Sequence, residues 1–211
     1  MRHGLTTMQT TRGLRAILSH HAVYGLFRRL TGSDKLNAAM VEQYIRPQPR
    51  DVIVDIGCGP ADIVQWLPEV RYYGIDLSED YIAAARRRWG DRGIFIRAEV
   101  GQIAWDDLPT ADIIMSLGVL HHLDDSQAIA LLRGAKAKLR NGGRFVSYDP
   151  CFTRPQHPVA RAIHRFDRGR NVRFDAPMTE LVRAVFPDAR CTVRTDLCRV
   201  PSTVLIVEAL K

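Results

Sequence analysis

Two glycines separated by one residue follow a short apolar run and carry the most specific chemical signal in the sequence. They form the segment Gly57-Cys58-Gly59. A Gly-x-Gly turn after a strand lets the backbone come close to a ligand, because no Cβ atom stands in the way. Asp76 ends the next apolar run, where a carboxylate can accept hydrogen bonds from two ribose hydroxyls. The combination predicts a binding site for a nucleoside cofactor.

Acidic residues around this loop favour a cationic cofactor. A dinucleotide site usually has a third glycine three residues after the second, and here that position is Asp62. Asp55, at the end of the first run, is a second carboxylate that would repel a pyrophosphate. The sulfonium and ammonium groups of S-adenosylmethionine suit both carboxylates. An NAD-dependent dehydrogenase is the alternative.

The elements that position this loop alternate between strand and helix patterns. Strands are predicted at residues 51–57, 72–77, 94–100, 111–119 and 144–148, and helices at 61–67, 79–89 and 124–140. Such alternation is typical of a parallel sheet covered by helices on both faces. A helix at 179–186 is then followed by extended segments at 191–200 and 203–210, joined tightly around Pro201-Ser202. We therefore expect an α/β fold with a doubly wound, Rossmann-like sheet of seven strands, mostly parallel with an antiparallel C-terminal hairpin.

The chain divides into four parts of one expected domain. They are an N-terminal helical cap (1–50), a cofactor-binding core (51–150), a basic lid insertion (151–176), and a C-terminal helix and hairpin (177–211). The first 33 residues carry five arginines and no Asp or Glu. Their apolar residues recur at helical spacing, which predicts a helix that packs over the site. A mitochondrial transit peptide is the alternative interpretation.

In these motifs residues 51–150 resemble the class I S-adenosylmethionine-dependent methyltransferases, and the terminal hairpin extends the resemblance to residue 211. The matching segments are Asp55-x-Gly57-x-Gly59, Asp76-Leu77, Ala98-Glu99-Val100, Asp112–Leu123 and Leu139–Gly143. The resemblance implies that the first segment, including Cys58, cradles the methionine moiety, that Asp76 binds the ribose, and that Leu77, Glu99 and Val100 contact the adenine. Two residues depart from the family pattern: Glu99 stands where Asp is more common, and Ala61 where many members have a third glycine.

Methyl transfer from a sulfonium is an in-line displacement that needs a positioned acceptor and the exclusion of water. A general base is required only when the acceptor must lose a proton. Because ligands bind outside the carboxyl ends of the strands in such sheets, Ser116 and Leu117 are expected near the cofactor. The candidate catalytic residues at the same edge are His121, His122 and Asp149. A structural role is the alternative for the histidines, and we expect no metal site.

The lid segment 151–176 contains six arginines and only two aspartates. The guanidinium group suits carboxylates and phosphates, so we expect Arg165 and Arg168, together with Tyr148, to hold an anionic acceptor. The alternative is a solvated helix face. The expected function is therefore methyl transfer to O, N or C of a small, anionic metabolite. The formal net charge of +7 leaves an RNA methyltransferase as an alternative, and a non-catalytic cofactor-binding subunit is another.

Composition excludes several other classes of protein. Hydrophobic residues make up 46% and charged residues 25% of the 211 residues, as in ordinary globular domains. No apolar run approaches the roughly 18 residues that span a bilayer. The four cysteines form no CxxC pair, so a reducing, cytoplasmic location is expected. The oligomeric state stays open.

Overall fold

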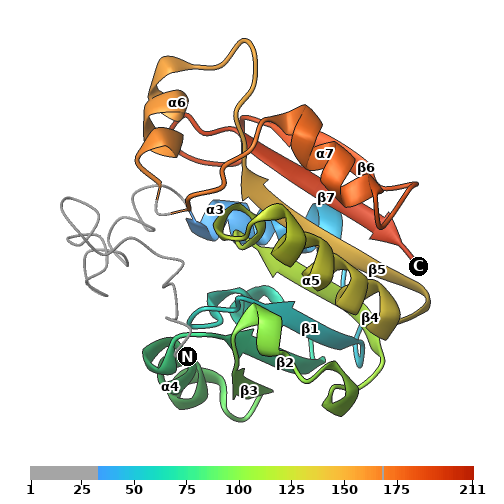
Figure 1. Cartoon of the computed structure of the whole chain (residues 1–211). Coiled ribbons are helices and arrows are strands. Elements are labelled where there is room, and N and C mark those ends of the chain that lie inside the picture. The colour runs from blue at the N-terminus through green and yellow to red at the C-terminus, as the bar shows by residue number, and fades with distance from the viewer. Residues whose placement is uncertain (1–32, 168) are drawn as a thin grey trace, which may run out of the picture.

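A seven-stranded sheet runs through the protein, seen in a computed structural model that describes residues 33–167 and 169–211 (Figure 1). The strand order is β3-β2-β1-β4-β5-β7-β6. The strands are β1 (Val52–Ile56), β2 (Arg71–Asp76), β3 (Gly93–Arg97), β4 (Ala111–Leu117), β5 (Leu139–Pro150), β6 (Arg190–Arg194) and β7 (Val204–Leu210). This architecture confirms the expected fold class.

The sheet is parallel from β3 to β5 and antiparallel from β5 to β6. Strand β1 pairs with β2 on one side and with β4 on the other, so the strand order reverses at β1. In open α/β sheets, ligands bind outside the carboxyl ends of the strands at such a reversal. The sequence places the Gly57–Gly59 loop directly after β1, at this position.

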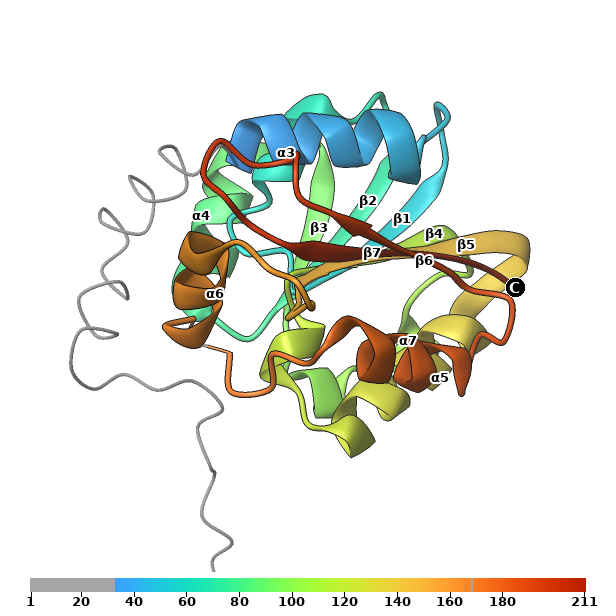
Figure 2. The ribbon, with the colours of Figure 1, turned by 90° about the horizontal axis from the view of Figure 1, so that it is seen from above.

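Helices cover both faces of the sheet (Figure 2). Helix α3 (Ser33–Ala39), continued by a π-helix at Met40–Ile45, and helix α4 (Glu79–Trp89) lie on one face. Helices α5 (Asp125–Lys138) and α7 (Asp175–Arg183) lie on the other. Helix α6 (Pro158–Arg165) stands beyond the carboxyl end of β5 (Figure 1). None of the helices described is long and apolar enough to cross a membrane.

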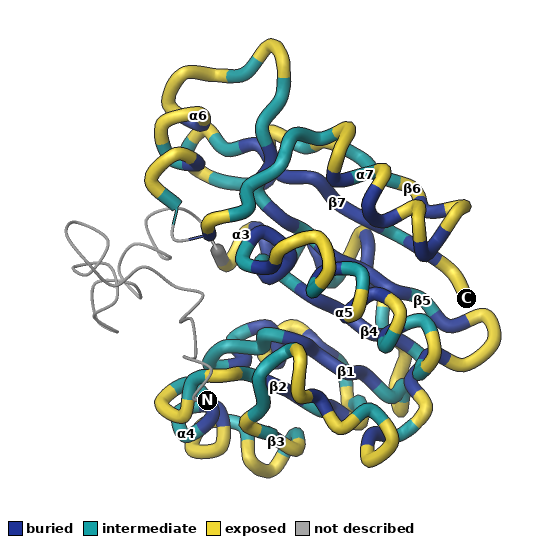
Figure 3. Tube along the Cα trace, in the orientation of Figure 1, coloured by how far each residue is buried: buried dark blue, intermediate teal, exposed yellow. Residues whose placement is uncertain are grey.

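The strands of the sheet are mostly buried (Figure 3), and their alternating side chains build two cores, one against each layer of helices. In β4, Ile114 packs in the cluster of α5 and α7, whereas Ile113 and Met115 pack in the cluster of α3 and α4. This period of two follows from the pleat of a strand. Burial of both faces explains why β1 and β4 read as continuous apolar runs.

Several element boundaries differ from those expected. Segments 191–200 and 203–210 do not form a tight hairpin, because β6 ends at Arg194 and a connection of residues 195–203 leads to β7. Helix α7 begins at Asp175 instead of 179 and ends three residues early. Strand β5 begins at Leu139, directly after α5, instead of at residue 144. Its pairing with β4 is irregular near this start. Most of the expected N-terminal cap, residues 1–32, lies outside the described residues.

Candidate functional site

The turn after β1 is fixed by backbone hydrogen bonds to the neighbouring strand β2. The amides of Gly57 and Cys58 both donate to the carbonyl oxygen of Ile75, at 2.7 and 3.0 Å. Gly57 and Gly59 adopt positive φ angles of 76° and 55°. Ala61 also has φ 55°, which accounts for the glycine that many members of the resembled family carry at this position.

The two glycines are required for different reasons. A Cβ atom on Gly57 would overlap Cγ2 of Val119, a side chain from the turn after β4. A Cβ atom on Gly59 would meet nothing within 4 Å, so this position borders open space. Gly57 therefore lets two turns of the protein pack together, while Gly59 leaves room for a ligand.

Asp55 is a buried carboxylate with one oxygen unused. Its side chain is 2% exposed, and the Tyr72 hydroxyl donates to Oδ2 at 2.6 Å. Oδ1 has no hydrogen-bond partner among the residues that the structure describes. Burial raises the pKa of Asp55 to about 7; the Tyr72 hydrogen bond acts against this shift, and the nearby Asp76 carboxylate adds to it. Because an unpaired buried carboxylate is costly, this oxygen is suited to a cationic ligand group.

Asp76 ends β2 and joins the glycine loop to the next helix. Its two oxygens accept the amide hydrogens of Gly59 at 2.9 Å and Ser78 at 2.8 Å. Each carboxylate oxygen can accept a second hydrogen bond, so capacity for ribose hydroxyls remains. Burial raises the pKa of Asp76, against the effect of these amides. Leu77 beside it is 54% exposed, as a contact for adenine would need to be.

These residues fit the cofactor that the sequence predicts. The unpartnered Asp55 oxygen suits an ammonium group, the space beside Gly59 accommodates a ligand, and exposed Leu77 offers an apolar surface. Glu99 and Val100 follow the carboxyl end of β3, the strand that pairs with β2. The structure therefore brings one end of the predicted site to a single edge of the sheet.

His121 lies between two carboxylates. Its Nδ1 is 2.8 Å from Oδ1 of Asp149, and its Nε2 is 3.2 Å from Oδ1 of Asp167. Burial lowers the pKa of His121, but the hydrogen bonds to Asp149 and Asp167 outweigh it and raise the pKa to about 9. Burial acts to raise the pKa of Asp167, and the His121 hydrogen bond overcomes it to give about 2. At neutral pH both ring nitrogens thus carry hydrogens, and neither can accept a proton.

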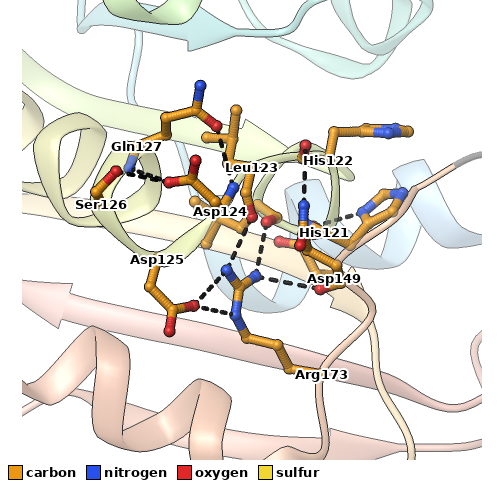
Figure 4. A network of polar contacts seen from close by, with 11 residues as sticks. His121, His122, Leu123, Asp124, Asp125, Ser126, Gln127, Asp149 and Arg173 are labelled. Carbon is orange, nitrogen blue, oxygen red and sulfur yellow. Dashed lines mark hydrogen bonds and ion pairs between the residues drawn. The ribbon is translucent and has the colours of Figure 1, made fainter. Parts of the chain in front are cut away.

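The segment after α6 docks on the turn that holds His121 (Figure 4). The Arg173 guanidinium donates to the carbonyl oxygens of Leu120 and Leu123 at 3.0 and 2.8 Å and to the Asp125 carboxylate at 2.7 Å. The backbone amide of Asn171 donates to the His121 carbonyl oxygen at 2.9 Å. These contacts fix the lid segment over the ends of β4 and β5.

The remaining predicted residues lie at varied depths around the same edge. Ser116 is fully buried in the sheet, whereas Leu117 at the end of β4 is partly exposed. The Tyr148 ring lies near Gly118: a Cβ atom at this glycine would be 3.8 Å from the ring. The ring of His122 is tilted by 39° relative to that of His121, with ring centroids 4.0 Å apart. Arg165 is exposed, and Arg168 lies outside the described residues.

Sequence reasoning missed Tyr72, Asp167 and Arg173 as partners within the site. Tyr72 is 17 residues from Asp55, and Arg173 is 48 residues from Asp125. No local spacing connects residues at such separations, and Arg173 stood among six arginines of the lid without a distinguishing feature.

Comparison with known proteins places this site in a family. A family model described as a methyltransferase domain matches residues 54–145. Trans-aconitate 2-methyltransferase of Mycolicibacterium gilvum (strain PYR-GCK) is 33% identical over 156 residues, which are 67% of this chain and 58% of the relative. A second such protein, from Mycobacterium ulcerans (strain Agy99), is 30% identical over 54% of this chain and 42% of its own length. The chain thus spans about half the length of these curated relatives.

Solved structures show the same fold. The phosphoethanolamine N-methyltransferase 2 of Haemonchus contortus, solved with S-adenosylhomocysteine, has a TM-score of 0.73 at 12% identity, covering 98% of this chain and 60% of that one. The S-adenosylmethionine-dependent methyltransferase SibL has a TM-score of 0.70 at 17% identity, covering 94% and 59%. Together with the glycine loop and the carboxylates at its edge, the family model and the curated relatives show that the chain belongs to the class I S-adenosylmethionine-dependent methyltransferases, whose cofactor is S-adenosylmethionine.

Proposed function

We propose that the protein transfers a methyl group from S-adenosylmethionine to a carboxylate oxygen of a small organic acid. The observation that carries the cofactor part is the unpartnered Oδ1 of Asp55 beside the glycine loop, at the point where the strand order reverses. When bound, the cofactor supplies an electrophilic methyl group on a sulfonium. Asp55 would face its ammonium group, and Asp76 would accept hydrogen bonds from its ribose.

The state of His121 supports an acceptor that needs no general base. Both ring nitrogens of His121 face carboxylates, so the ring holds its proton and positions the lid. A carboxylate acceptor is already deprotonated at neutral pH, and it requires only orientation and the exclusion of water. The relatives from Mycolicibacterium and Mycobacterium, named as trans-aconitate methyltransferases, support an acid as the acceptor.

Two measurements test this proposal. Calorimetric titration should show binding of S-adenosylhomocysteine and not of NAD. Incubation with tritiated S-adenosylmethionine and, separately, trans-aconitate, citrate and total RNA should label a small acid, with no change after ribonuclease treatment. Binding of NAD alone would contradict the cofactor assignment, and label that ribonuclease removes would contradict the acceptor.

A further inference from the structure

A cleft of about 450 Å³ opens at the carboxyl edge of the sheet, away from the glycine loop. One wall comes from the segment after β5 and the other from the connection between β6 and β7. The lining residues are Thr153, Pro155, Gln156, His157, Thr195, Cys198, Arg199, Val200, Pro201, Ser202 and Thr203. None of them was among the residues that the sequence predicted for the site.

Arg199 brings a positive charge to this cleft. Arg199 is exposed and makes no hydrogen bond or ion pair with any residue in the described ranges. His157 stands on the opposite wall, and its Nδ1 accepts the Val159 amide hydrogen at 3.2 Å. This bond leaves Nε2 as the ring nitrogen that can donate a hydrogen bond to a ligand. No Asp or Glu is among the lining residues.

Neutral residues also line the cleft. The side-chain amide nitrogen of Gln156 is fixed by the Cys151 carbonyl oxygen at 3.1 Å. The other end, Oε1, is buried and has no hydrogen-bond partner among the residues that the structure describes, so it does not face the cleft. Pro155, Val200 and Pro201 add apolar surface for a short carbon skeleton.

The cleft and the glycine loop open at the same edge of the sheet. Pro150 at the end of β5 pairs with Val204 at the start of β7, so both walls begin at the edge that carries the glycine loop. Only β4 lies between β1 and β5. Because neighbouring strands are about 4.8 Å apart, β5 ends about 10 Å from β1 along this edge. A small molecule held in the cleft could therefore extend toward a cofactor at the glycine loop.

We propose that this cleft binds an anionic group of the methyl acceptor, a carboxylate or a phosphate, through Arg199 and His157. The inference rests on the proposed function and assigns its anion site to residues outside the lid arginines. The guanidinium fork of Arg199 suits either anion. An acceptor with two acidic groups could place one here and present the other to the methyl donor.

The test is direct binding to the full chain, measured by calorimetry with and without S-adenosylhomocysteine. The probes are trans-aconitate, phosphoethanolamine and the trimethyl ester of aconitate. Arg199→Ala should weaken binding of the favoured anion about 10-fold to 100-fold, as for loss of a charged hydrogen bond, and Arg199→Lys should restore part of it. Arg133→Ala, which removes an exposed arginine on α5, is the charge-matched control and should change nothing.

The outcomes separate this inference from the proposed function. Binding of trans-aconitate alone identifies a carboxylate site, and binding of phosphoethanolamine alone identifies a phosphate site. If Arg199→Ala binds the anion as tightly as the wild type, if the neutral ester binds equally well, or if neither trans-aconitate nor phosphoethanolamine binds, the cleft is not the anion site. Failure of S-adenosylhomocysteine to bind the wild type would instead overturn the proposed function.

Discussion

Substitution of the two loop glycines tests the placement of the cofactor, because Gly57 is needed for packing and Gly59 leaves room for a ligand. Gly59→Ala places a methyl group in open space at the ligand side, and Gly57→Ala drives one into Val119. Both positions have positive φ, which costs an alanine roughly 1–2 kcal/mol. The overlap with Val119 adds about 1–3 kcal/mol at Gly57 alone.

These magnitudes translate into distinct thermal shifts. In a chain of this size, 1 kcal/mol lowers the Tm by about 2–4 °C. Gly59→Ala should therefore lower the Tm by about 2–8 °C, and Gly57→Ala by about 4–20 °C. For ligand binding, Gly59→Ala should be the more harmful of the two changes. It should weaken S-adenosylhomocysteine binding by at least about tenfold, because the alanine methyl group fills the space beside the loop.

Differential scanning calorimetry and ligand titration on the same preparations measure both effects. Val119→Ala in the Gly57→Ala background is the internal control, since removing the overlapped methyl groups should restore part of the lost stability. Native ligand affinity in Gly59→Ala would refute our placement of the cofactor. A greater loss of stability in Gly59→Ala than in Gly57→Ala would refute the packing role of Gly57.

Three further predictions concern charge. Asp55, with its pKa near 7, is mostly protonated at pH 6, and the ammonium group of a ligand favours its ionised form. S-adenosylhomocysteine affinity should therefore rise about fivefold between pH 6 and 7 and about twofold more by pH 8, and Asp55→Asn should abolish this rise. The His121 ring should titrate near pH 9 in NMR spectra, so its stabilising effect is full below 6.5 and lost through 9, and Asp167→Asn should lower that midpoint. Arg173→Met should lower the free energy of unfolding in urea by about 2–4 kcal/mol, with Arg133→Ala unchanged.

The elements that depend on nearby residues were predictable from sequence. Strand β1, its glycine loop and Asp76 lie within a short stretch whose periodicity and turn residues determine its conformation. Helix α4 likewise begins where Ser78 accepts the Tyr81 amide hydrogen, a local cap that the sequence displays.

The connection between β6 and β7 shows why the remainder could not be predicted. Its residues read as a continuation of a strand, but Leu197 leaves the sheet and packs in the cluster of α3. Lys35 of α3 donates to the Asp196 carbonyl oxygen at 2.8 Å, across 161 residues of sequence. Contacts with the first described helix therefore override the local β pattern, and they create one wall of the cleft around Arg199.

The charged state of His121 links the lid to the choice of acceptor. A histidine that served as base would need a free ring nitrogen and a pKa near neutrality, whereas here Asp149 and Asp167 occupy both nitrogens. If the acceptor is a carboxylate, the rate of methyl transfer should not follow the titration of this ring between pH 7 and 8. A rate that rises tenfold per pH unit there would instead indicate that Asp167 releases the ring during catalysis, and that the acceptor gives up a proton.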